Sequence, residues 1–156
     1  FDLLTADEHE IDQYTRELRF DIGLLSERMI ACIDWLEGEA VVNGLPIGLF
    51  GASTGAAAAL NAAAERPERV TAVVSRGGRP DLAMNALQLV QCPTLLIIGG
   101  LDRQVIELNR VAEAALKAPC RVEIVAGATH LFEEPGTLEQ VAALARNWFL
   151  EHTGNG

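Results

Sequence analysis

The sequence has 156 residues, 49% of them hydrophobic and 22% charged, which is enough to bury the core of one domain and excludes a disordered chain. A formal net charge of −10 with a single lysine, Lys117, argues against nucleic acid as a partner. No apolar stretch reaches transmembrane length and no signal-peptide pattern is present, so we expect a cytoplasmic protein that does not associate with membranes.

From residue 20 onward, helical and strand patterns alternate along the chain. Apolar stripes or runs of strong helix formers predict helices over residues 20–36, 54–66, 105–117 and 138–152. Short apolar or alternating runs predict strands over residues 47–50, 70–75, 94–98 and 121–125, and residues 76–91 are expected to form a loop with a short helix near 81–89. This alternation predicts a single α/β domain over residues 1–156, with a mostly parallel sheet and helices on both faces.

The cysteines and tryptophans are interpreted as structural residues. Cys32, Cys92 and Cys120 are odd in number and widely spaced, so they form neither a disulfide framework nor a metal or redox pair. Trp35 and Trp148 lie on predicted helices and are expected in the core. The sequence contains no metal-ligand spacing, dinucleotide-binding motif or phosphate-binding loop, and we expect no cofactor.

The most informative segment is Gly51-Ala52-Ser53-Thr54-Gly55, which fits the pattern G-x-S-x-G. A predicted strand precedes it and an alanine-rich helix follows it, which is the context of a nucleophile elbow. In such an elbow Ser53 takes a positive φ and presents its hydroxyl at the helix N-terminus. Side chains in place of Gly51 and Gly55 are expected to collide as strand and helix close up. The alternative interpretation is a Gly-Ser loop that caps a helix.

An elbow serine requires an acid and then a histidine, each just past a later strand. Asp102 follows predicted strand 94–98, and His130 follows predicted strand 121–125. Because parallel strands end at one edge of the sheet, we expect Ser53, Asp102 and His130 to lie together, with His130 as the base and Asp102 as the acid that orients it. The competing acids are Glu107, Glu133 and Glu134, and the competing histidines are His9 and His152.

Further candidate groups surround this predicted triad. The backbone N–H of Thr54 is the one identifiable oxyanion-hole donor, and the Thr54 side chain is expected to cap the following helix. Arg76 and Arg79 flank two glycines just past predicted strand 70–75. They either bind a substrate carboxylate or belong to a solvated turn, and the sequence leaves both alternatives open.

Three stretches of this chain resemble α/β-hydrolases of the dienelactone-hydrolase-like group, and more narrowly the hydrolase domains found fused to phosphoribosyltransferase-like domains. They are GLFGASTGA at 48–56, VSRGGRPDL at 74–82 and GATHLFEEPG at 127–136. The resemblance implies a serine hydrolase of the carboxylesterase kind that acts on small esters through an acyl-enzyme, with lactone opening as the alternative. Only residues 76–93 stand where such enzymes often insert a cap domain, so it also implies an open site with broad specificity.

Members of this group carry additional N-terminal strands and a Gly-rich loop that donates the second oxyanion-hole amide. Here residues 1–4 resemble the end of a family strand, and predicted strand 47–50 would lack a neighbour and expose an apolar edge. We therefore expect a fragment, roughly the C-terminal two-thirds of the family domain; a partner segment or a rearranged sheet are the alternatives. Such an edge favours a homodimer, and a shortened module of this kind would be catalytically weak without a partner segment.

Overall fold

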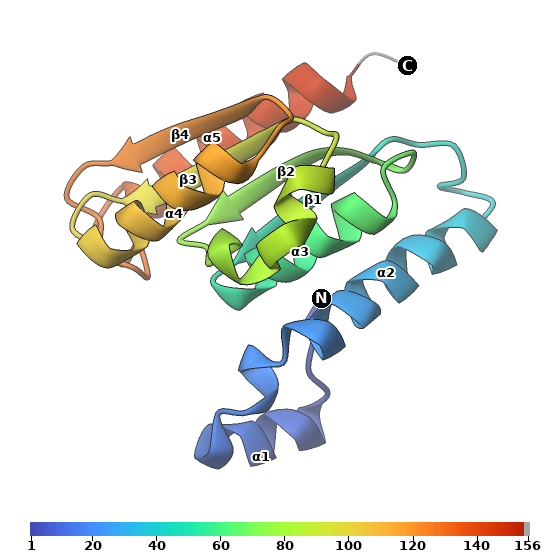
Figure 1. Ribbon diagram of the computed structural model, residues 1–156, viewed down its shortest axis with the longest axis horizontal. Coiled ribbons are helices and arrows are strands. Elements are labelled where there is room, and N and C mark those ends of the chain that lie inside the picture. The colour runs from blue at the N-terminus through green and yellow to red at the C-terminus, as the bar shows by residue number, and fades with distance from the viewer. Residues whose placement is uncertain (155–156) are drawn as a thin grey trace.

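A four-stranded parallel sheet organises the computed structural model, which describes residues 1–154 (Figure 1). The strands are β1 (Ile47–Ala52), β2 (Val70–Arg76), β3 (Thr94–Gly99) and β4 (Cys120–Val125). The helices are α1 (Ala6–Thr15), α2 (Ile22–Gly38), α3 (Thr54–Glu65), α4 (Arg103–Ala115) and α5 (Thr137–Thr153), with 3₁₀ segments η1 (Leu18–Phe20) and η2 (Pro80–Leu89). The predicted α/β class is confirmed, and every helix and strand predicted from residue 20 onward is present.

The order of the strands in the sheet is β1-β2-β3-β4, which is also their order in the chain. Right-handed crossovers between successive parallel strands place all connections on one face. Accordingly α3, η2 and α4 share one face, and α5, which follows the last strand, covers the other (Figure 1). β1 is an edge strand, as expected for a strand that lacks a neighbour on one side.

Two apolar layers fill the space between the sheet and its helices. Val73 of β2 points into the layer under α3 and η2, whereas its neighbour Val74 points into the layer under α5, beside Trp148. The alanine run at the start of α3 is fully buried, and its small side chains let the helix lie close to β1 and β2. Each large side chain buried in these layers contributes about 1.5–3 kcal/mol to stability.

Trp35 does not belong to the core, contrary to the sequence prediction. Its side chain is 61% exposed, whereas Trp148 is buried as predicted. The reason is the helical period: the inward face of α2 carries Leu25, Met29 and Ile33, at successive intervals of four residues, and Trp35 is displaced from that stripe.

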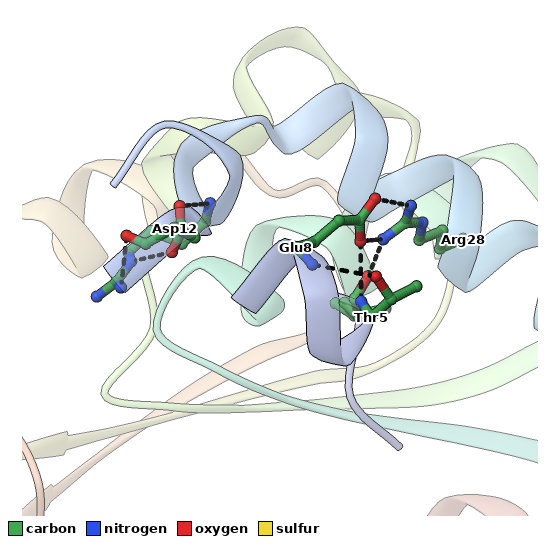
Figure 2. Close-up of polar contacts among 6 residues, drawn as sticks. Thr5, Glu8, Asp12 and Arg28 are labelled. Carbon is green, nitrogen blue, oxygen red and sulfur yellow. Dashed lines mark hydrogen bonds and ion pairs between the residues drawn. The ribbon is translucent and has the colours of Figure 1, made fainter. Parts of the chain in front are cut away.

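The N-terminal segment projects from the rest of the molecule (Figure 1). The sequence analysis predicted no helix before residue 20, yet α1 begins with a reciprocal capping box between Thr5 and Glu8. Figure 2 shows Glu8 also paired with Arg28 of α2, with Arg28 Nη2 2.6 Å from Glu8 Oε1. Asp12, almost fully buried, accepts from Arg19. Polar contacts rather than apolar packing therefore fix α1.

Residues 1–4 form no strand, so the predicted resemblance to the end of a family strand does not appear in the structure. A strand exists only when its backbone groups pair with a neighbour. Residues 1–4 lie across a cleft from β1 instead of beside it. Within residues 1–154, no helix combines the length and apolar character needed to cross a membrane.

Candidate active site

The chain reverses sharply between β1 and α3, and Ser53 stands at the tip of this turn. Its backbone has φ 50° and ψ −123°, the strained conformation predicted for an elbow serine. A side chain on Gly51 would overlap the backbone of Gly55 and Ala56, as predicted. The expectation for Gly55 was wrong: a Cβ there meets nothing within 4 Å, because Gly55 borders an open cleft.

Asp102 and His130 form a hydrogen-bonded pair at the carboxyl ends of β3 and β4. His130 Nδ1 lies 2.7 Å from Asp102 Oδ2. Asp102 is the N-cap residue of α4, yet its side chain makes no capping hydrogen bond. Its carboxylate, with a side chain 16% exposed, is therefore available to His130, whose side chain is 41% exposed. A carboxylate partner requires the proton on Nδ1 and leaves Nε2 free to accept another.

Residues 76–79, here called the glycine turn, lie between the elbow and this pair. Ser53 N donates to Arg76 O at 3.3 Å, and Arg79 N donates to Ser53 O at 3.0 Å. Gly77 has φ 49°, and a Cβ there would lie 3.1 Å from His130 O and 3.6 Å from His130 Nδ1. The glycine turn thus contacts the predicted nucleophile on one side and the predicted base on the other.

The side chain of Ser53 makes no hydrogen bond to any group of residues 1–154. Within the predicted triad, the link from Ser53 to His130 is therefore the contact that the structure does not form. Catalytic hydrogen bonds are often long before a substrate binds and shorten in the complex, so the arrangement remains compatible with a triad.

The competing acids have other roles. Glu107 is 74% exposed on the outer face of α4. Glu133 is exposed in residues 127–134, the loop that carries His130 and is here called the histidine loop. Glu134 accepts a hydrogen bond from the Thr129 N–H at 3.1 Å, and the Thr129 side chain together with this N–H holds the pKa of the Glu134 carboxyl below its usual range. Glu134 thereby braces the loop that carries His130. This role of Glu134 is not predicted from the sequence, because a side chain that accepts from a backbone N–H five residues earlier follows no common sequence motif.

The Thr54 N–H is the first N–H of α3, where helical N–H groups have no intrahelical acceptor. The Thr54 N–H therefore has no acceptor within the helix, which an oxyanion-hole donor requires. The predicted capping role of the Thr54 side chain was wrong: among residues 1–154, no side-chain hydrogen bond caps the start of α3. The positive φ at Ser53 turns the chain so abruptly that the usual capping geometry is not available.

Arg76 and Arg79 lie at the ends of the glycine turn in different surroundings. Arg79 donates through Nε and Nη2 to both oxygens of Asp81, at 2.9 and 2.8 Å, and this pairing raises the pKa of Arg79. Arg76 lies with its guanidinium 5.7 Å from the ring centre of Phe132 and donates to Leu131 O at 3.5 Å. Within residues 1–154, no carboxylate pairs with Arg76.

The thiols of Cys92 and Cys120 are poor nucleophiles at neutral pH. Burial raises the pKa of Cys92 to about 11 and that of Cys120 to about 12. Both thiols, with Cys32, are free in the structure. In the described part of the chain, no group of three His, Cys, Asp or Glu side chains is arranged to hold a metal ion.

A cleft of about 930 Å³ runs along the free edge of β1 and reaches the elbow at Ala52, Thr54 and Gly55. Its opposite wall comes from residues 1–6, His9 and Arg19, which belong to the projecting N-terminal segment. His9, a competing histidine of the sequence analysis, is thus placed across the cleft from the elbow strand, away from Asp102. His152 packs edge-on against Trp148 in α5.

These elements, with Ser53 in an elbow and an Asp–His pair at the same end of a parallel sheet, define an α/β hydrolase fold. The model of the dienelactone hydrolase family matches residues 5–151, and the chain belongs to this family. The resemblance stated from the sequence is therefore confirmed.

Several known proteins are also similar to this chain. The chain is 56% identical to a dienelactone hydrolase of Anabaena variabilis, with a TM-score of 0.93 over 97% of this chain and 70% of that one. It is 55% identical over 97% of its length to Mycobacterium tuberculosis proteins whose names propose a phosphoribosyl transferase, and it spans about a third (33%) of their length. Est1E of Butyrivibrio proteoclasticus, 16% identical, shares the fold, with a TM-score of 0.71 over 86% of this chain and 71% of that one.

Proposed function

We propose that this protein is a serine hydrolase that cleaves small carboxylic esters through an acyl-enzyme. The observation that carries the proposal is the 2.7 Å contact between His130 and Asp102 beside an elbow that holds Ser53 at φ 50°. A histidine or an aspartate with a purely structural role would require neither this contact nor a positive φ at Ser53. Family membership supports hydrolysis, and the site residues support the serine mechanism.

In the proposed first step, His130 Nε2 takes the proton of Ser53 as Ser53 Oγ attacks the ester carbonyl. Asp102 accepts from Nδ1–H and stabilises the imidazolium that forms. The Thr54 N–H, at the N-terminus of α3, stabilises the oxyanion. The C–O bond to the alcohol then breaks, and His130 returns its proton to the leaving oxygen. Water, activated by the same base, hydrolyses the acyl-enzyme and restores Ser53.

Arg76 is the better of the two arginines for a substrate carboxylate. Both Arg79 donors that face Asp81 are occupied, whereas the Arg76 guanidinium has no carboxylate partner within residues 1–154. A cation that is stacked on Phe132 next to the histidine loop is suited to bind an anionic group of the substrate. We therefore include esters with a distal carboxylate among the proposed substrates.

Lactone opening is the second candidate, and the 56% identity to a dienelactone hydrolase favours it. A lactone is a cyclic ester, so the same residues would act, and the leaving alkoxide would stay attached to the acyl group. Initial rates with activated acyl esters and with enol-lactones separate the two activities. A clear preference for enol-lactones in kcat/KM would assign the protein to lactone hydrolysis.

The nucleophile is tested by treating the protein with an alkyl phosphonofluoridate and measuring intact mass. The wild-type chain should gain one adduct, and Ser53→Ala should gain none and lose several decades of esterase rate. Because the substitution relaxes a strained turn, Ser53→Ala should remain folded by circular dichroism. An adduct that forms equally on Ser53→Ala would contradict the serine mechanism.

A further inference from the structure

Asn109 of α4 is completely buried, with 0% of its surface exposed, and the mechanism above does not use it. Its Nδ2 donates to Gly78 O at 3.0 Å and to Val105 O at 2.8 Å. These two carbonyl partners fix the orientation of the amide, because the flipped amide would set oxygen against oxygen. The amide oxygen, Oδ1, is buried without a hydrogen-bond partner in the described chain. Leucine has a similarly branched side chain but no donor for Gly78 O, so the distinctive contribution of the amide at this position is its bond to the glycine turn.

The bond to Gly78 completes a set of contacts around the glycine turn. Arg76 O and Arg79 N both bond to the backbone of Ser53, and Gly77 N donates to Ile97 O of β3 at 2.8 Å. Gly78 O accepts from Asn109. The backbone of every residue in the turn therefore makes a hydrogen bond to another part of the chain. Of these four bonds, only the bond to Gly78 O has a side-chain partner, Asn109.

The glycine turn also has little space to move into. A Cβ on Gly78 would overlap the Ser75 hydroxyl and the Ala56 methyl group, and Gly77 lies against His130. The turn is therefore packed between the elbow and the histidine loop. If Gly78 moves, the turn residues that bond to Ser53 and contact His130 are expected to move with it.

We propose that Asn109 is a positioning residue that sets the placement of Ser53 relative to His130. Asp102 is the N-cap residue of α4, so Asn109 connects the helix that follows the proposed acid to the turn that holds the proposed nucleophile. Ser53 is thus connected to Asp102 and His130 by a series of contacts: the glycine turn bonds to Ser53, Asn109 of α4 bonds to the turn, and Asp102 at the start of α4 bonds to His130. This inference rests on the serine mechanism proposed above.

The test replaces the amide with an apolar side chain of similar branched shape. Asn109→Leu should fold with a Tm near the wild-type value, because the removal of the unpaired Asn109 Oδ1 offsets the loss of the donor to Gly78 O. With p-nitrophenyl acetate, kcat and the rate of Ser53 phosphonylation should fall about 10- to 100-fold, as expected when a catalytic group is displaced by about 1 Å. KM should stay near the wild-type value, because the substrate does not contact Asn109.

Thr94→Val is the matched control. Thr94 is also fully buried and polar, but it lies at the start of β3, at the opposite end of the sheet from the elbow. This variant should change Tm with little effect on kcat. If Asn109→Leu does not fold, Asn109→Ser takes its place, since serine can bond Val105 O but cannot reach Gly78. It should show the same loss of kcat.

The outcomes separate this inference from the proposed function. If the wild-type chain is never phosphonylated, the serine mechanism fails and the inference fails with it. If the wild-type chain is phosphonylated and the Asn109 variant reacts at the same rate with the same kcat, the inference alone is overturned. A loss of kcat in Asn109→Leu at an unchanged Tm, absent from Thr94→Val, supports it.

Discussion

At Ser53 the backbone holds a conformation that a Cβ disfavours, and the strain is balanced by hydrogen bonds on both sides of the residue. The bonds from Arg79 N and to Arg76 O place the residue, and Asp102 and His130 are placed by the ends of β3 and β4. The proposed hydrolysis thus depends on three side chains, those of Ser53, Asp102 and His130, whose positions are set by the backbone that carries them.

Asp102→Asn should cut the esterase rate by about 10⁴-fold while the fold stays intact, because an amide favours the wrong tautomer of His130. The measurement is kcat/KM with an activated ester, together with a thermal unfolding curve. Glu107→Gln, an exposed acid five residues along the same helix, is the control and should retain the wild-type rate. Nearly full activity in Asp102→Asn would remove Asp102 from the triad.

Glu134→Ala should lower kcat several-fold, because the histidine loop loses the carboxylate that accepts from Thr129 N–H. Since that bond lowers the pKa of Glu134, its contribution is present above the ordinary carboxyl pKa and is lost as the pH falls through the lowered value. Hydrogen exchange of residues 127–134 should increase in this variant and, for the wild type, on acidification. Glu133→Ala should behave like the wild type; an equal loss in both variants would contradict the role of Glu134.

Glycine has two different roles near the elbow. Gly78→Ala should destabilise the protein by about 1–3 kcal/mol, since the added methyl overlaps Ser75 and Ala56 in a packed region. Gly55→Ala should be neutral or stabilise it by up to about 1 kcal/mol, because the position is helical and open. Urea unfolding of the two variants measures both changes. Equal destabilisation would show that Gly55 is sterically required after all.

At the scale of elements, the sequence predicted the strands and the main helices because each carries an apolar period and a clear stop signal. It predicted no α1, since that helix buries almost nothing except Asp12 and has no apolar stripe. The one local signal was Thr5 followed three residues later by Glu8. α1 is held to α2 by charge, which hydrophobic periodicity cannot detect.

Glu8→Gln should release α1 from α2, because the amide cannot reproduce both the cap and the ion pair with Arg28. The pKa of Glu8 is lowered from its ordinary value of 4.5 to about 2 by the Arg28 bond and the Thr5 backbone bond. The tether is therefore complete above about pH 4.5 and is lost as the pH falls toward 2. Amide exchange in residues 6–15 measures this release, and Glu10→Gln, on the same helix, should leave it unchanged.

Across the whole molecule, strand order predicted that Ser53, Asp102 and His130 lie at one end of the sheet, but it did not predict the contacts that hold these three residues in place. Ser53, Asp102 and His130 each follow a strand, and parallel strands end together. Asn109 reaches Gly78 from 31 residues away, and no local pattern announces such a contact. The cleft beside β1 likewise depends on how the N-terminal segment folds back, which the sequence analysis expected to be a strand end.

The two edges of the sheet differ, and we propose that the chain associates with itself through β1. β4 carries the ion pair of Arg121 and Glu123, a common protection against pairing, whereas β1 has no charged residue. Light scattering should show dimers or larger species, and Phe50→Lys on β1 should shift them to monomers. Ile124→Lys on β4, where the side chain is equally exposed at 45%, is the control. A monodisperse wild-type monomer at all concentrations would contradict the proposal.

The match between strand order and chain order has a consequence for biosynthesis. A chain that leaves the ribosome adds β2, β3 and β4 one after another to the growing edge of the sheet, since no strand has to be inserted between two others. Ser53 follows β1 and takes its position once β2 has formed, whereas His130, the proposed base, follows β4. We therefore expect a nascent chain to carry a formed elbow that stays chemically silent until residue 130 has emerged and β4 has joined the sheet.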